Sequence, residues 1–163
     1  MNVFVLDTDP AIAATYLCDK HVPKMALEAA QLAATCLHLL GVDGVPKKDG
    51  GFYKPTHKGH PCRVWASETR ANFEWLLVHG LAICDEHRLR GGKLTAIRAA
   101  LEWALLRSSA LPDGPLTPHA LAVGETPHGP TVVDTYRAYY VTEKAGIAHW
   151  RKGRPAPFWW PTA

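Results

Sequence analysis

The 163-residue chain lacks the patterns that define several large classes of protein. No apolar run approaches the roughly 20 residues that a membrane-spanning helix needs. Its first residues, Met-Asn-Val-Phe-Val-Leu-Asp, show neither the basic start nor the long apolar stretch of a signal peptide. We therefore expect a cytoplasmic protein with no membrane partner. A chain of this length is expected to form one domain over residues 1–163.

Cysteine is also sparse, since the four residues stand far apart and form no CxxC pair. This pattern excludes the usual zinc modules, and disulfides are rare in a cytoplasm. Two short pairs, Cys18 with His21 and His60 with Cys62, are the metal-ligand candidates and keep open a small Cys/His metalloenzyme. Free cysteine is more commonly a small buried apolar residue. We therefore predict no metal and no cofactor.

A glycine-rich phosphate loop and the common hydrolase motifs are also missing. The net charge is only +3, which permits nucleic-acid binding without requiring it, because clustered charge matters more than total charge. One basic run lies in the loop predicted for residues 41–59. Its members are Lys47, Lys48, Lys54, His57 and Lys58. Most such runs are solvated, but one that borders an active site can bind phosphate.

Hydrophobic periodicity predicts an all-α fold, a compact single-domain helical bundle with an extended N-terminal arm at residues 2–6. Asp9 and Pro10 have the residue types of a helix cap and a first helical position. Pro23 marks either a kink or a first turn, and Thr95 is expected to cap a helix. The expected helices cover 10–18, 20–40, 61–90, 95–108 and 131–150, and the loops rich in proline and glycine cover 41–59 and 110–130.

The start of the second expected helix carries a polar stripe. His21, Lys24 and Glu28 follow one another at spacings of three and four residues, so they share one face. On this pattern alone, Lys24 and Glu28 are a surface ion pair worth roughly 0.2–0.5 kcal/mol. A lysine beside a carboxylate in a dry pocket can instead act as a nucleophile. The candidate catalytic residues are therefore Glu28, Lys24, Lys20, His21 and His60.

His60 joins this group because it precedes Pro61 at a predicted helix start, where the helix dipole favours a neutral imidazole. The alternative is that it only caps the helix.

In the last expected helix, aromatic and basic residues alternate and can stack on bases or hold phosphates, although such residues also pack in cores. The candidate substrate-binding residues are Asp19, Arg63, Trp65, Asn72, Tyr136, Arg137 and Tyr140.

Several short motifs of this chain resemble the pyrimidine-dimer DNA glycosylase family of T-even phages. They are Leu17-Cys18-Asp19-Lys20-His21, which leads to Glu28 without a gap, then Gly59-His60, and then Glu86 followed by Arg90-Gly91. A group of small phage and actinobacterial proteins is similar in its Asp-Lys, Lys, Glu and His-Pro positions, followed by a tryptophan that matches Trp65. This second resemblance covers nearly the whole chain.

The glycosylase resemblance implies an all-helical enzyme that excises a damaged or modified pyrimidine from double-stranded DNA and cleaves the abasic strand through an imine. Glu28 then corresponds to the catalytic glutamate. The family's nucleophile is an α-amine exposed when the initiator Met is removed before a small residue. Because Met1 precedes Asn2 here, Lys20 or Lys24 is expected to take that place. A flipped nucleotide would stack on Trp65 and the tyrosines.

A non-catalytic binding module uses the same residues differently. Lys20, Lys24 and His60 would bind an anionic group, such as a nucleotide or a partner of a phage protein, while Glu28 orients Lys24. In either case we expect a monomer whose partner is double-stranded DNA or a nucleotide.

Overall fold

The computed structural model describes residues 1–161, and within that range the chain forms six α-helices, a 3₁₀ helix and no strand. The predicted all-α class is confirmed. No helix in this part of the chain combines the length and apolar character needed to cross a membrane. The elements are α1 (Pro10–Tyr16), α2 (His21–Leu39), α3 (Pro61–Ala66), α4 (Arg70–Leu89), α5 (Thr95–Leu105), η1 (Ser108–Ala110) and α6 (Val132–Glu143).

The first two helices begin as their sequences predict. Asp9 caps α1, and its Oδ1 accepts hydrogen bonds from the amides of Ala11 at 2.7 Å and Ile12 at 3.0 Å. Pro10 is the first residue of that helix. Pro23 is the third residue of α2 and therefore lies in its first turn, where the missing N–H removes no intrahelical bond.

The single helix predicted over 61–90 is wrong, because the chain breaks it into α3 and α4. Ser67 ends α3, and Thr69 adopts an extended conformation with φ of −140°. The Thr69 hydroxyl accepts a hydrogen bond from the Asn72 amide at 3.1 Å and so caps α4. A threonine that caps a new helix therefore overrides a continuous apolar pattern.

The last two α-helices are shorter than predicted. Thr95 is the first residue of α5 rather than its cap, and the residues at the far end form the separate turn η1. Helix α6 ends at Glu143 instead of reaching residue 150. The segment after it bonds to the corner between α1 and α2, because the His149 carbonyl accepts from the Asp19 amide at 2.9 Å. These tertiary bonds replace the next helical turns.

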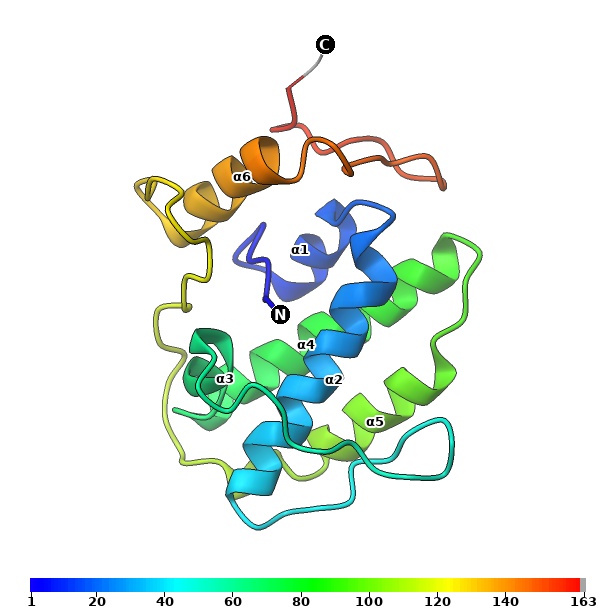
Figure 1. Ribbon diagram of the computed structural model, residues 1–163, viewed down its shortest axis with the longest axis vertical. Helices are drawn as coiled ribbons and strands as arrows, with labels where there is room; N and C mark the ends of the chain where they lie inside the picture. Colours follow the sequence, from blue (N-terminus) through cyan, green and yellow to red (C-terminus); the bar gives the residue numbers. More distant parts are fainter. Residues whose placement is uncertain (162–163) are drawn as a thin grey trace.

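Helix α4 lies at the centre and packs against α1, α2 and α5 (Figure 1). Gly80 permits the close approach of these helices. A Cβ added at this residue would lie 3.0 Å from Ala29 Cβ and 3.0 Å from Leu101 Cδ1. The position therefore has no room for a larger residue.

The N-terminal arm is part of the core. Residues 3–6 form no regular secondary structure, yet all four side chains are buried. Phe4 packs edge-on against the rings of Tyr136 and Tyr140, and the Leu6 carbonyl accepts from Arg137 Nε at 2.9 Å. Figure 1 shows α6 and the C-terminal segment lying across this end of the molecule.

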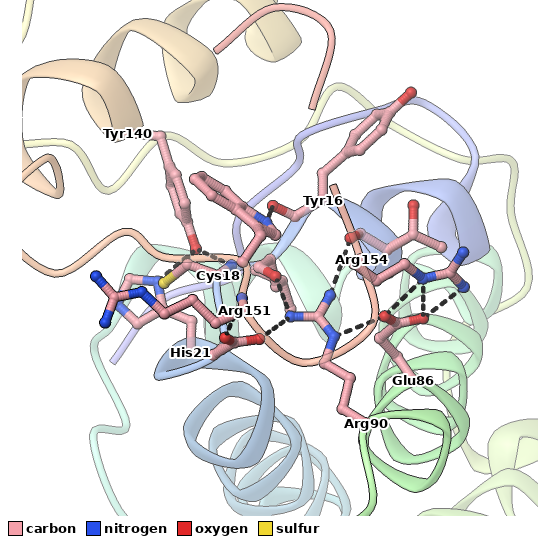
Figure 2. Close-up of polar contacts among 12 residues, drawn as sticks. Tyr16, Cys18, His21, Glu86, Arg90, Tyr140, Arg151 and Arg154 are labelled. Atoms are coloured by element: carbon pink, nitrogen blue, oxygen red, sulfur yellow. Dashed lines mark hydrogen bonds and ion pairs between the residues drawn. The ribbon is translucent and has the colours of Figure 1, made fainter. Parts of the chain in front are cut away.

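A buried arginine ties the corner between α1 and α2 to the end of α4 (Figure 2). Arg90 has a side chain that is only 3% exposed, and its Nε donates to Glu86 Oε1 at 2.7 Å. Its Nη1 donates to Asp19 Oδ1 and to the Leu17 carbonyl, each at 2.9 Å, and its Nη2 to the Thr15 carbonyl at 3.1 Å. One side chain thus satisfies the carbonyls of Thr15 and of Leu17, the residue that caps α1.

Glu86 extends this network to the C-terminal segment. Its Oε2 accepts from Arg154 Nη2 at 2.8 Å, besides the bond from Arg90. Burial alone would raise the pKa of the Glu86 carboxyl, but the hydrogen bonds from Arg154 and Arg90 outweigh burial and hold that pKa below its usual range.

Arg90→Met should lower the free energy of unfolding by about 3–5 kcal/mol, because the Asp19 carboxylate and the α1 carbonyls lose their buried partner. Urea unfolding followed by circular dichroism measures the loss. The matched control is Arg88→Met, whose side chain is 72% exposed and should change stability by less than about 0.5 kcal/mol. Equal losses in the two variants would contradict the assigned role of Arg90.

Candidate active site

A pocket of about 240 Å³ lies where the start of the chain meets α2 and the residues around the end of α6. Glu28 and Lys24 line it from α2, and Met1 and Asn2 from the N-terminal arm. Lys144, just after α6, also lines it. Three of the predicted catalytic residues, Glu28, Lys24 and His21, are therefore brought to one cavity.

Glu28 is the acidic residue of the pocket, and its side chain is 10% exposed. Its Oε2 accepts a hydrogen bond from the main-chain N–H of Asn2 at 2.8 Å and lies 4.0 Å from the amino group of Met1. Lys24 Nζ lies 3.8 Å from Oε1, and the Lys24 side chain is 61% exposed. Two main-chain nitrogens and one lysine thus surround a nearly buried carboxylate, which therefore keeps its charge compensated.

The side chain of Asn2 fixes the main chain in this position. Its Nδ2 donates to the Ala122 carbonyl at 2.8 Å, and its Oδ1 accepts from the Val3 amide at 2.8 Å. The buried Tyr136 hydroxyl lies 3.1 Å from the same oxygen. No local pattern singles out Asn2, because Ala122 and Tyr136, which hold its side chain, lie more than a hundred residues away along the chain.

His21 forms part of the pocket wall and is buried. Its ring stacks on Phe4 with centroids 4.9 Å apart, and its Nδ1 hydrogen-bonds the Tyr140 hydroxyl at 2.6 Å (Figure 2). Burial, followed by the positive charges of Lys24 and Lys144, lowers the pKa of His21 to about 4. The imidazole is therefore neutral at pH 7 and adds no charge to the pocket.

Lys20 and His60 do not line this pocket. Lys20 is exposed and is the residue immediately before α2. His60 caps α3, where its Nδ1 accepts from the Cys62 amide at 3.2 Å. Burial and the nearby charge of the chain's amino group lower the pKa of His60, against a backbone hydrogen bond to Met1 that raises it. His60 thus lies near the start of the chain, behind the pocket wall.

Three of the predicted substrate-binding residues lie in the core. Trp65 is 3% exposed and stacks on His119 with centroids 4.6 Å apart, while Asn72 and Tyr136 are fully buried. Asn72 Nδ2 donates to the Trp65 carbonyl at 2.8 Å. None of these three side chains offers a free face to a substrate in this structure.

The other four predicted substrate-binding residues also hold the fold together. Asp19 pairs with Arg90, and Tyr140 is a buried partner of His21. Arg137 pairs with Asp7 and bonds Leu6, and Arg63 Nη1 donates to Ser67 Oγ at 3.0 Å. Phe4 and Tyr139 line the pocket instead, and their rings stack with centroids 6.1 Å apart.

The four metal-ligand candidates are divided between two places. Cys18 and His21 meet at the Tyr140 hydroxyl, whereas Cys62 lies beside Asn2 Oδ1 at 3.7 Å. Within residues 1–161, no three His, Cys, Asp or Glu side chains are grouped closely enough to hold a metal ion.

The fold and the pocket define a helical protein in which a nearly buried glutamate faces the amino end of its own chain. A family model described as pyrimidine dimer DNA glycosylase matches residues 1–99. The chain belongs to the pyrimidine dimer DNA glycosylase family, a family of DNA glycosylase and AP lyase enzymes, and this membership implies DNA as substrate. Searches of curated proteins and of solved structures gave no match.

Lys144→Met and Lys24→Met should each raise the pKa of His21 above its value of about 4, because both positive charges oppose protonation of the ring. Titration of the His21 ring by NMR measures the change. Lys48→Met, a change outside the pocket, is the control and should leave the His21 pKa unchanged. An unchanged pKa in both pocket variants would show that the two lysines point away from the ring.

Proposed function

We propose that the protein is a DNA glycosylase and AP lyase acting on a damaged or modified pyrimidine in double-stranded DNA. The observation that carries the proposal is the 2.8 Å bond between Asn2 N and Glu28 Oε2, with the Met1 amino group 4.0 Å from the same oxygen. This arrangement lies within the region that matches the family. One chain supplies both groups, so the proposed site needs no residue from a second subunit.

The nucleophile in this proposal is the main-chain amine at the start of the chain. If Met1 stays in place, its amine is the reacting group, and if Met1 is removed, the nitrogen of Asn2 becomes an amine beside Glu28. The two main-chain nitrogens lie 2.8 Å and 4.0 Å from Glu28 Oε2, beside the carboxylate that takes the proton in this proposal. Lys24 is the alternative, but its 61% exposed ammonium stays solvated.

The proposed reaction first breaks the bond between sugar and base. The free amine attacks C1′, and the N-glycosidic bond breaks. The base leaves with the electron pair of that bond and takes a proton from solvent. Glu28 takes the proton that the amine loses and passes it to the ring oxygen as the deoxyribose ring opens. The product of this stage is an imine between the amine and C1′.

The second stage breaks the strand. Glu28, again a carboxylate, removes a proton from C2′, and the electrons of that C–H bond expel the 3′ phosphate. Water then hydrolyses the imine and releases the amine. Lys24 and Lys144 line the pocket from different elements, and in this proposal they hold the flanking phosphates.

Glu28→Gln should reduce borohydride trapping on duplex DNA with one abasic site by at least 100-fold, because the amide cannot accept the proton from the amine. Gel electrophoresis of the reduced adduct measures trapping. Glu102→Gln changes an exposed glutamate on α5 and should give the same yield of trapped adduct as the natural protein. Full trapping by Glu28→Gln would remove Glu28 from the mechanism.

The reduced adduct should map to the N-terminal peptide of the protein, because the main-chain amine is nearest to Glu28 Oε2. Peptide mass spectrometry identifies the modified residue, and the intact mass shows whether Met1 is retained. Lys24→Met should still be trapped. An adduct on Lys24, together with loss of trapping in Lys24→Met, would assign the nucleophile to that lysine instead.

A further inference from the structure

A second and larger hollow lies farther along α2, next to the face that carries Lys24 and Glu28. It is a groove of about 1340 Å³ between α2, the loop over residues 47–56 and the start of α5. Figure 1 shows this loop reaching out beside α5 and returning across α2 to α3. Sites for small molecules measure roughly 300–1,000 Å³, so this groove suits an extended ligand.

The rim of the groove is basic. Four lysines line it against a single aspartate, Asp49, and that aspartate pairs with Lys47 at 3.4 Å. The four are Lys47, Lys48, Lys54 and Lys93. Three come from the basic run in the loop, and Lys93 comes from the turn before α5. Two separate segments thus present positive charge to one space, which favours an anionic occupant.

The floor of the groove is apolar and includes an exposed aromatic ring. Phe52 is 62% exposed and Leu27 is 39% exposed, and Leu94 and Ile97 add partly buried apolar surface from the other wall. Exposed apolar surface of this kind, rimmed by polar residues, marks a binding site. A ligand with phosphates alone would bind the lysines and leave this apolar surface exposed to water. Unpaired bases, in contrast, can stack on the Phe52 ring.

The loop that carries Phe52 is held in place by its own hydrogen bonds. The Tyr53 amide donates to the Val45 carbonyl at 2.9 Å, and the Lys47 amide donates to the Gly51 carbonyl at 2.8 Å. Thr56 is joined to Thr35 of α2, whose hydroxyl accepts from the Thr56 amide at 3.0 Å. The groove is therefore preformed, which lowers the entropic cost of binding.

The groove and the candidate active site share α2 as a common wall. Leu27 and Gln31 line the groove, and Lys24 and Glu28 line the pocket. Gln31 follows Glu28 by one helical turn, so a strand that leaves the pocket along α2 enters the groove directly.

We propose that this groove binds an unpaired stretch of the DNA strand next to the damaged nucleotide, with the lysines on its phosphates and Phe52 stacked on a base. The placement beside the pocket rests on the proposed function, whereas the affinity for unpaired DNA does not. The preferred substrate is then a lesion that lies beside a gap, a nick or a frayed end rather than one inside a fully paired duplex.

Fluorescence anisotropy with an undamaged, labelled single-stranded oligonucleotide tests the groove directly. The double variant Lys54→Ala/Lys93→Ala should weaken binding by about tenfold and reduce the slope of log K against log salt by about 1.4, that is, about 0.7 for each lost phosphate contact. Phe52→Ala should weaken binding by about fivefold or more. Phe52→Leu, which keeps an apolar side chain without a ring, should show most of that loss.

Matched controls come from exposed residues outside the groove. Lys58→Ala removes an exposed lysine of the same loop that lies outside the groove, and Phe158→Ala removes an aromatic residue that is 80% exposed elsewhere. Both should bind the oligonucleotide as the natural protein does. Unchanged binding in the groove variants, or equal affinity for a blunt duplex of the same sequence, would overturn the proposal. So would a change of oligomeric state in Phe52→Ala without weaker binding of DNA, because the occupant would then be a second copy of the chain.

Borohydride trapping on abasic duplex DNA separates this proposal from the proposed function. If the natural protein is not trapped but the groove variants still weaken single-strand binding, the glycosylase mechanism fails and the groove stands. If trapping proceeds and the groove variants bind as tightly as the natural protein, the groove fails alone.

Discussion

The bonds of the buried Arg90 guanidinium are the constraint on which the arrangement of this protein depends. They join the last carbonyls of α1, the carboxylate of Asp19 and the carboxylate of Glu86. Because α2 begins two residues after Asp19, these bonds also anchor the start of the helix that carries Glu28. Glu86 holds Arg154 as well as Arg90, so the C-terminal segment is anchored to the same network.

The pocket is built by two parts of the chain that differ in their relation to the family. Residues 1–99, which match the family, supply Glu28, Lys24 and the amino end. Ala122, Tyr139 and Lys144 lie beyond that region and form the opposite wall. In the proposed mechanism the reacting groups therefore come from the part that matches the family, and one wall of the pocket comes from the part outside the match.

Sequence periodicity could predict where most helices lie and the Glu28 stripe, because both depend on local spacing along one helix, but it missed the break between α3 and α4. It could not separate Trp65, Asn72 and Tyr136 from site residues, because aromatic and amide side chains serve cores and binding sites equally well. Their burial is decided by the helices that pack around them. Asn2 and Lys144 could not be predicted as site residues for a related reason. Their places in the pocket arise from contacts between distant segments, which no local pattern encodes.

Burying a carboxylate is costly unless hydrogen bonds and positive charge compensate it. In this protein, the compensation for Glu28 comes from the groups that the proposed reaction uses: the Asn2 nitrogen, the amino terminus and Lys24. The arm that carries these nitrogens is itself held in the core by Phe4 and by the side chain of Asn2. A main-chain nitrogen is thus positioned as rigidly as a catalytic side chain usually is. The fold and the proposed chemistry consequently both require the first residues of the chain to hold their main-chain nitrogens beside Glu28.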